Sequence, residues 1–241
     1  MGENGEEDVP DGKLSVSKPI RNGVKNWGVA TGLMFGLMIA IGMRCNVGVA
    51  VVKVFSDNIT TGKAAFDWTV DDLTNVDESF FWGHILTQLL GGVLATFFLK
   101  PNLVFGVAIL VTSLLNLLLP VASTLDPTAV IAVRVLQGLA DGATIPACFA
   151  TLSLWAPSSV RTTIATLAFS GVYFGMTIGQ GLSGFLADTF SWNTPYYFYG
   201  CLGIVWFLFW GCFSSENPGS NTNTQQSARP ALRTTPWLKV G

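Results

Sequence analysis

The sequence predicts an all-α membrane protein with six transmembrane helices, and three observations support this fold class. Half of the 241 residues are hydrophobic and only 12% are charged, which is unusual for a water-soluble domain. The mean hydropathy of +0.49 points the same way. The apolar residues also gather into runs of about 20 residues or more, the length that a helix needs to cross a bilayer.

Each apolar run is interpreted as one helix, because the runs are continuous, as in LVFGVAILVTSLLNLLLPVA. Strands of a transmembrane barrel would instead alternate apolar and polar residues. Together the runs predict a six-helix bundle over residues 27–214. In order along the chain they cover roughly residues 28–54, 79–99, 103–124, 128–154, 163–187 and 196–213.

The segments outside the runs are polar. Residues 1–26 are first acidic and then basic, and residues 215–241 are rich in Ser, Asn, Thr and Pro. Such segments have little apolar surface to bury, so we predict a disordered arm and a disordered tail. Between the first two runs, residues 55–78 are predicted to form a loop.

The basic residues outside the runs predict the orientation of the bundle. All of them except Lys63 lie on one side of the predicted topology, with Lys53 at the edge of the other side, and an excess of Lys and Arg marks the cytoplasmic side. Both termini are therefore predicted to be cytoplasmic and the loop 55–78 to be luminal. Asn58-Ile59-Thr60 in that loop is a glycosylation sequon, which makes Asn58 a predicted glycosylation site. The cytoplasmic residues are Lys13, Lys18, Arg21, Lys25, Lys100, Arg161, Arg229, Arg233 and Lys239.

Apart from Lys53 at the end of the first run, three charged residues lie inside the apolar runs: Arg44, Arg134 and Asp141. Each costs on the order of 2.5 to 3.5 kcal/mol at a helix centre, so such groups normally face the bundle interior or a water-filled cavity. Arg134 and Asp141 are two turns apart on one helix face, with Gln137 between them. Because about 10 Å of helix separates the two charges, we expect each to contact Gln137, water or another helix.

Two interpretations of these charges remain open. In the first they line an anion pathway, because a guanidinium suits carboxylate or phosphate and a desolvated Asp141 can exchange a proton near neutral pH. In the second they form a buried ion network that holds the helices together. His84, the one histidine of the sequence, is interpreted either as a proton carrier or as a packed polar residue.

Two further patterns concern packing and metals. Gly171, Gly175 and Gly179 are four residues apart and predict a face for close helix packing. The four cysteines lack the spacing of metal ligands, so no metal site is predicted.

A remote alternative is an intramembrane serine protease. Residues 181–184, GLSG, have the form that surrounds the nucleophilic serine of rhomboid proteases, with Ser183 at that position. A serine nucleophile needs a base within hydrogen-bond reach. In rhomboids the histidine follows the serine, whereas His84 precedes Ser183, so we predict that the chain is not an enzyme.

Several motifs in the right order resemble solute carrier family 17 of the major facilitator superfamily. This family includes sialin, the vesicular glutamate and nucleotide transporters and the type I sodium-phosphate cotransporters. The resemblance runs from about residue 27 to residue 218. Its motifs are GMRCNVGVAVV (42–52), SFFWGHILTQLLGG (79–92), RVLQGLADGATIPAC (134–148), WAPSSVRTTIAT (155–166) and YYFYGCLGIVWFLFW (196–210).

The resemblance implies secondary active transport of a small organic or inorganic anion by alternating access. Arg44 matches the residue of the first helix that binds the anionic group. Arg134 and Asp141 match a charge-balance and coupling pair, and with Gln137 and His84 they form the expected coupling network. Na⁺ or H⁺ is the expected coupling ion, with no other cofactor. The expected location is a vesicular, lysosomal or plasma membrane.

The resemblance also carries limits on substrate and length. Asp77 stands where glutamate-transporting members have a histidine, so glutamate is not assigned as the substrate. Members have two six-helix halves with the substrate cavity between them, and this chain resembles only the N-terminal half. We therefore expect a truncated form of a longer transporter. The alternative is a non-transporting half-molecule that modulates a full-length relative by pairing with its C-terminal half. No feature suggests nucleic-acid binding.

Overall fold

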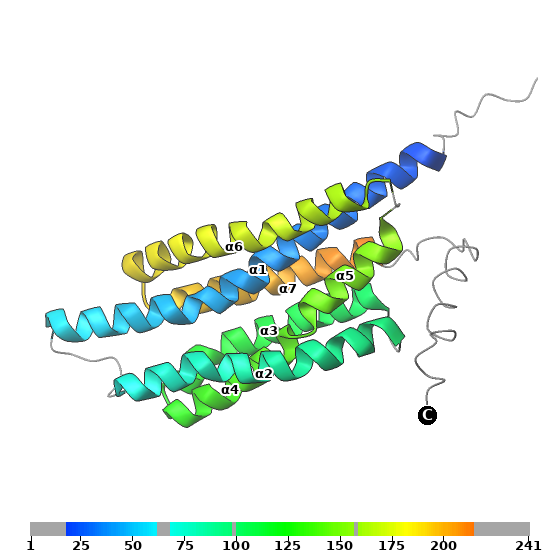
Figure 1. Ribbon diagram of the computed structural model, residues 1–241. Helices are drawn as coiled ribbons and strands as arrows, with labels where there is room; N and C mark the ends of the chain where they lie inside the picture. The colour runs from blue at the N-terminus through cyan, green and yellow to red at the C-terminus, as the bar shows by residue number, and fades with distance from the viewer. Residues whose placement is uncertain (1–17, 62–67, 98–99, 157–158, 215–241) are drawn as a thin grey trace, which may run out of the picture.

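The computed structural model describes residues 18–61, 68–97, 100–156 and 159–214, and their regular secondary structure is entirely helical (Figure 1). This confirms the predicted all-α membrane fold. The helices are α1 (Lys18–Thr61), α2 (Val70–Phe97), α3 (Pro101–Ser123), α4 (Pro127–Asp141), α5 (Thr144–Trp155), α6 (Arg161–Thr189) and α7 (Thr194–Ser214).

Four segments of the described chain are long and apolar enough to cross a bilayer. They are Trp27–Val49 within α1, Pro101–Ser123, Pro127–Trp155 and Arg161–Thr189. The remaining two predicted spans correspond to α2 and α7, which have 28 and 21 residues. Hence each predicted apolar run contains a helix or, in the fourth case, a helix pair.

The fourth run differs from the prediction, because it forms two helices instead of one. Helix α4 ends at Asp141 and α5 begins at Thr144. Pro146 explains the break: in a continuous helix its ring would clash with the carbonyl of Gly142 four residues earlier. In the observed structure Pro146 lies in the first turn of α5, where a missing N–H costs nothing. Asp141 thereby becomes the last residue of a helix.

The predicted boundaries of the arm and the loop differ from the structure. Helix α1 already includes residues 18–26 and continues through residues 55–61. Once a helix has formed, each added residue gains a backbone hydrogen bond, and no proline follows Pro19 within α1. Asn58 is therefore in the last turn of α1, and its glycosylation remains a prediction. The rest of the predicted arm and the whole predicted tail lie outside the described residues.

Helix α2 also begins earlier than predicted, at Val70, because Thr69 and Asp72 form a capping box. The Thr69 hydroxyl accepts a hydrogen bond from the Asp72 backbone N–H at 3.2 Å. The Asp72 carboxylate accepts in return from the Thr69 backbone N–H at 3.0 Å and from its hydroxyl at 2.7 Å. A reciprocal pair of this kind stabilises the first turn of a helix. The predicted loop 55–78 is thus shortened from both sides.

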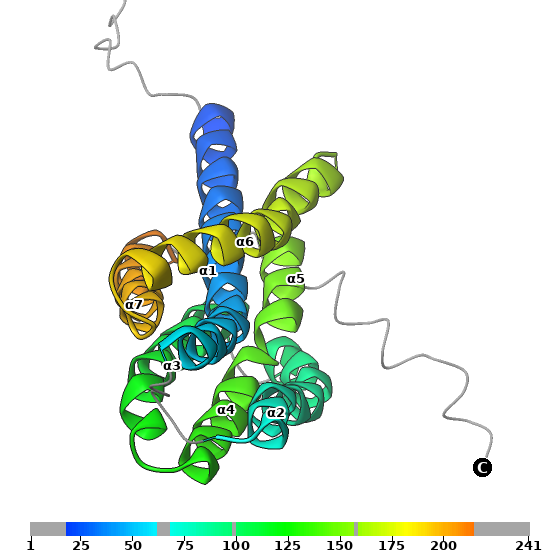
Figure 2. The ribbon, with the colours of Figure 1, turned by 90° about the vertical axis from the view of Figure 1, so that its left-hand side faces the viewer.

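Close helix contacts arrange the bundle. Helix α1 packs along α6 and also contacts α7, while α2 packs along α4 (Figures 1 and 2). A methyl group on Gly171 would collide with the Met34 carbonyl of α1, and one on Gly175 would lie 2.7 Å from the Met38 carbonyl. Gly179 likewise faces Gly42 of α1. The predicted role of these glycines in close packing is confirmed.

A second close contact joins α2 to α4. A methyl group on Gly138 would collide with the Phe80 carbonyl, and one on Gly142 would lie 2.6 Å from the His84 carbonyl. The two backbones can approach only because these positions lack a side chain. This contact brings His84 of α2 next to Asp141, at the end of α4.

Candidate functional site

Three side chains from three helices meet between the two core clusters of the bundle. Arg44 comes from α1, His84 from α2 and Asp141 from the end of α4. The first core cluster includes Met43 and the second includes Val47, so Arg44 lies at the level where they join. We call Arg44, His84 and Asp141 the charged triad.

The triad is centred on one carboxylate oxygen. The Nη2 atom of Arg44 donates to Oδ2 of Asp141 at 2.6 Å, which is a short, charge-assisted contact. Nδ1 of His84 lies 3.3 Å from the same Oδ2 and 3.3 Å from Nη2 of Arg44. The other oxygen of Asp141, Oδ1, accepts a hydrogen bond from the Thr144 hydroxyl at 3.4 Å. The break between α4 and α5 makes this last contact possible, because Thr144 starts the next helix.

The members of the triad differ in exposure. The side chain of Asp141 is 6% exposed and that of His84 is 11% exposed, whereas 26% of the Arg44 side chain is exposed. Among the described residues, the buried Nε atom of Arg44 has no hydrogen-bond partner. Arg44 is thus anchored by Asp141 while part of its guanidinium remains available to another acceptor.

Arg134 belongs to a separate polar network. Its side chain is 1% exposed, and Nη1 donates to Oε1 of Gln137 at 3.1 Å. Gln137 donates in turn to Oδ1 of Asn116 at 3.4 Å, and Asn116 donates to the Tyr196 carbonyl at 2.8 Å. Nη2 of Arg134 lies 3.6 Å from Oδ1 of Asp77, whose side chain is 56% exposed. This network joins α2, α3, α4 and the start of α7.

The pairing of the charges was not predicted. Arg134 and Asp141 lie on one helix, yet Asp141 contacts Arg44, His84 and Thr144, whereas Arg134 contacts Gln137 and Asp77. Contact of Arg134 with Gln137 and of Asp141 with another helix had been expected. The aromatic ring of Phe80 lies between the two groups, with its centroid 4.7 Å from Cζ of Arg44 and 4.9 Å from Cζ of Arg134.

Sequence reasoning missed Phe80, Asn116 and Thr144. Phe80 looks like an ordinary core residue, although an aromatic face beside a guanidinium contributes a cation–π contact. Asn116 is the one strongly polar side chain in the middle of the third apolar run, and that isolation was a usable signal. Thr144 gave no signal, because its role depends on the helix break.

Ser183 is in a different environment from the triad. Its buried hydroxyl donates to Oδ1 of Asn46 at 2.5 Å, and Nδ2 of Asn46 donates to the Pro195 carbonyl at 3.4 Å. The polar contacts of His84 with other side chains of the described residues are to Arg44 and Asp141. Ser183 therefore joins α6 to α1, and a serine–histidine pair is not among the described contacts.

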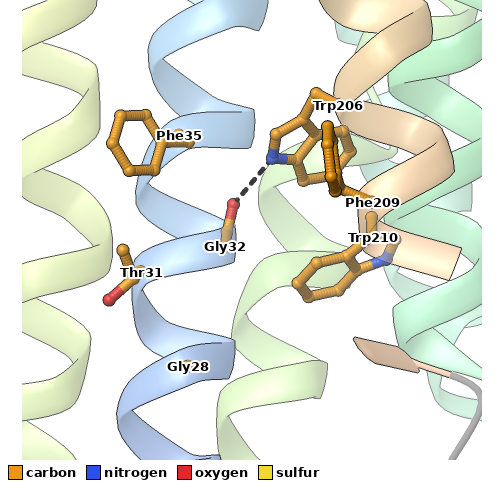
Figure 3. Close-up of a pocket in the computed structure, with 7 residues that line it drawn as sticks. All are labelled: Gly28, Thr31, Gly32, Phe35, Trp206, Phe209 and Trp210. Carbon is orange, nitrogen blue, oxygen red and sulfur yellow. Dashed lines mark hydrogen bonds between the residues drawn. The ribbon is translucent and has the colours of Figure 1, made fainter. Parts of the chain in front are cut away.

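An apolar groove lies between α1 and α7, away from the triad (Figure 3). Its volume is about 440 Å³. The indole N–H of Trp206 donates to the Gly32 carbonyl at 3.2 Å and that of Trp210 to the Asn102 carbonyl at 2.8 Å. With these groups satisfied, the walls present mainly aromatic rings. The lining residues are Gly28, Thr31, Gly32, Phe35, Trp206, Phe209 and Trp210.

Comparisons with known proteins place this geometry in context. The family model of the Major Facilitator Superfamily matches residues 27–240. Vesicular glutamate transporter 2 of Mus musculus and of Homo sapiens are each 40% identical to the chain over 201 residues. Vesicular glutamate transporter 1 of Xenopus laevis is 39% identical over 201 residues.

The alignments cover most of this chain but a minor part of each relative. For the two mammalian proteins they cover 80% of the chain and 34% of the relative, and for the Xenopus laevis protein 80% and 35%. The chain therefore spans about a third of the length of the curated relatives that it matches.

Proposed function

The chain belongs to the Major Facilitator Superfamily, and from this premise we propose that it supplies one half of a secondary active transporter for small organic or inorganic anions. The resemblance to solute carrier family 17 is confirmed by relatives that are vesicular glutamate transporters. In facilitators the solute site lies between two halves, and the charged triad is the part of that site contributed by this chain.

The environment of Arg44 carries the proposal. A guanidinium has five N–H donors in a planar fork, which suits the oxygens of a carboxylate or phosphate. Asp141 occupies one edge of this fork, and a quarter of the Arg44 side chain is exposed, whereas that of Arg134 is 1% exposed. An arginine within an apolar span is costly unless it faces the interior or a wet cavity. Arg44 is therefore proposed as the anion ligand.

Asp141 is proposed as the counter-charge of Arg44 in the empty state. When an anionic group binds Arg44, it replaces part of the contact with Asp141, and the carboxylate then needs a new partner or a proton. Arg134 has a different proposed role. Because it is almost fully buried and bonded to Gln137, it balances charge and holds α2, α3 and α4 in register without contacting the solute.

Uptake of radiolabelled L-glutamate and inorganic phosphate into proteoliposomes that hold this chain together with the C-terminal half of a full-length relative tests the role of Arg44. We expect Arg44→Ala to lower uptake about tenfold or more, because charge-assisted hydrogen bonds to the solute are lost. Arg44→Lys should restore part of the activity, since it keeps the charge but loses the fork. Arg161→Gln is the matched control. Arg161 is the first residue of α6, and its guanidinium donates to the backbone carbonyls of Ser153 and Ala156. Undiminished uptake by Arg44→Ala would contradict the assignment.

A second function is a non-transporting half-molecule that modulates a full-length relative. Its support is the coverage: the chain matches about a third of each relative's length and therefore supplies one side of the expected cavity. The same proteoliposomes distinguish the two functions. Modulation predicts no uptake by the chain alone, co-purification with a co-expressed full-length relative, and a change in that relative's uptake rate. Uptake by the chain paired with a C-terminal half, abolished by Arg44→Ala, supports transport.

A further inference from the structure

The position of His84 is unusual because its Nδ1 atom lies equally close to a cation and an anion. The distance from Nδ1 is 3.3 Å both to Nη2 of Arg44 and to Oδ2 of Asp141. Arginine can only donate a hydrogen bond, and an ionised carboxylate can only accept one. The imidazole therefore has a possible partner at the same place in either protonation state.

The two protonation states of His84 favour different partners. A neutral ring with its proton on Nε2 accepts a hydrogen bond from Arg44 at Nδ1. In this state the contact between Arg44 and Asp141 is kept. A protonated ring has an N–H at Nδ1 that donates to Oδ2 of Asp141. In that state two cations compete for one carboxylate oxygen, and the net charge of the triad rises from zero to one positive charge.

We infer that His84 is the proton-binding residue of the anion site: its protonation draws Asp141 away from Arg44 and frees Arg44 for one anionic group of the solute. This inference rests on the proposed function. The Nδ1 lone pair takes the proton from water and returns it when the anion leaves. One proton and one negative charge therefore enter the triad together, and its net charge is zero before and after.

The other titratable groups around His84 have partners of their own. On its own helix, Asp77 lies beside Arg134 of α4, so these two charges offset each other. The Phe80 ring stacks on the His84 ring with centroids 5.7 Å apart and also covers Arg134. Arg44 and Asp141 are therefore the charges that face the imidazole directly.

The remaining helices packed against α2 contribute little charge. Helix α3 contains no titratable side chain. Helix α5 contributes Thr144, which donates to Asp141, and Cys148, which is buried in the first core cluster. On α1, the titratable neighbour of Arg44 is the thiol of Cys45, which is half-buried.

Because His84 is the one histidine of the chain, its titration can be observed directly. Nuclear magnetic resonance of the full chain, labelled with ¹⁵N-histidine in phosphatidylcholine nanodiscs, reports the protonation of both ring nitrogens. We expect unprotonated Nδ1 at high pH and protonation of both nitrogens once the pH is low enough to charge the ring. L-glutamate and inorganic phosphate are the anion probes. Either bound anion should raise the pH midpoint of this titration.

Anion affinity provides the reciprocal measurement, because coupled equilibria influence each other equally. We expect the probe to bind roughly tenfold more tightly at pH 5.5 than at pH 8 in the wild-type chain. In His84→Asn, whose amide replaces Nδ1, the affinity should be independent of pH over this range. A pH dependence that persists in His84→Asn would overturn the inference and place the proton elsewhere, with Asp141 the first alternative.

Arg44→Ala separates failure of this inference from failure of the proposed function. Without the competing guanidinium, His84 should titrate at a higher pH than in the wild-type chain, whether or not an anion binds. An unchanged or lower midpoint would overturn the competition for Asp141. If the wild-type chain binds neither probe at any pH, the proposed function fails. Anion binding without a change in the His84 titration overturns only the inference. The wild-type titration also stands if His84→Asn does not fold.

Discussion

At the scale of single residues, the buried polar groups divide into two sets with different tasks. The triad contains a partly exposed arginine that is held by one carboxylate. The network of Arg134 runs through neutral partners, Gln137 and Asn116, to a backbone carbonyl, with the Asp77 carboxylate 3.6 Å from the Arg134 guanidinium. An exposed guanidinium with free donors can bind solute, whereas a fully enclosed one fixes the helices around it.

Gln137→Leu should destabilise the bundle. The leucine keeps most of the volume but leaves Nη1 of Arg134 without its acceptor, and a lost hydrogen bond to a buried charge costs about 1.5–3 kcal/mol. The expected result is a lower melting temperature in detergent and a correspondingly lower free energy of unfolding. Gln88→Leu on α2 is the matched control, because Gln88 is exposed. Equal melting temperatures for the two variants would show that the Arg134 network does not stabilise the fold.

The sequence identified which charged side chains must be buried, but it did not show which of them form ion pairs. Arg44, Arg134 and Asp141 were identified because ionised groups are rare in apolar helices. The spacing of Arg134 and Asp141 argued against a direct pair within one helix but left their partners open among Gln137, water and another helix. The observed partner of Asp141 comes from α1, 97 positions earlier in the chain. A pairing over this distance depends on how helices pack, which spacing along one helix does not contain.

At the scale of elements, the site is positioned by close contacts between helix backbones at glycine positions. The glycines of α6 seat it on the backbone of α1, and Gly138 and Gly142 seat α4 on α2. Such contacts gain dispersion energy only while both backbones remain close. The four-residue spacing on α6 made the first contact predictable. The second was not predicted, although Gly138 and Gly142 are also four residues apart, because Gly142 lies in the break that follows α4.

Gly171→Ala should weaken the α1–α6 contact. Its methyl group would meet the Met34 carbonyl, and overpacking of this kind costs about 1–3 kcal/mol. Gly181→Ala on the same helix is the matched control, since nothing lies within 4 Å of the added methyl group. Alanine at that position should be neutral or slightly stabilising, because it favours the helix over glycine. Thermal unfolding that ranks Gly171→Ala at or above Gly181→Ala would contradict this packing.

The start of α2 should respond to acid. Asp72 lies ahead of the second apolar run, and hydrogen bonds from the Thr69 hydroxyl and then from its backbone N–H lower the pKa of Asp72 below the ordinary value of 3.8. Because the pKa is lower in the folded chain, the cap stabilises α2 above that ordinary value and is lost as the pH falls through the folded value.

A carboxylate titration of Asp72 by nuclear magnetic resonance measures this effect. Thr69→Val removes the hydroxyl and should move the midpoint upward, toward the ordinary value. Thr128→Val, which removes a hydroxyl at the Asp126 cap of α4, is the matched control and should leave the Asp72 midpoint unchanged. An unchanged Asp72 midpoint in Thr69→Val would rule out the capping box as the cause.

At the scale of the whole molecule, the bundle is asymmetric in its polarity. The triad lies where α1, α2 and α4 meet, whereas the groove between α1 and α7 is lined by apolar and aromatic side chains. In a membrane, a face of this second kind can lie against lipid, and a face with a partly exposed arginine needs water, solute or a protein partner. This asymmetry supports one-sided pairing with a second half of a facilitator.

The sequence alone was sufficient for the fold class, the apolar spans and the family resemblance, because these depend on composition, on run length and on motifs within single helices. Only the tertiary structure showed that Asp141 contacts Arg44 and His84 and that Phe80 lies beside both guanidiniums. It also showed that the fourth span is divided into two helices near Pro146. The reason is physical: the free energy of a buried ion pair depends on distances between different helices, and those distances are set by packing contacts throughout the bundle.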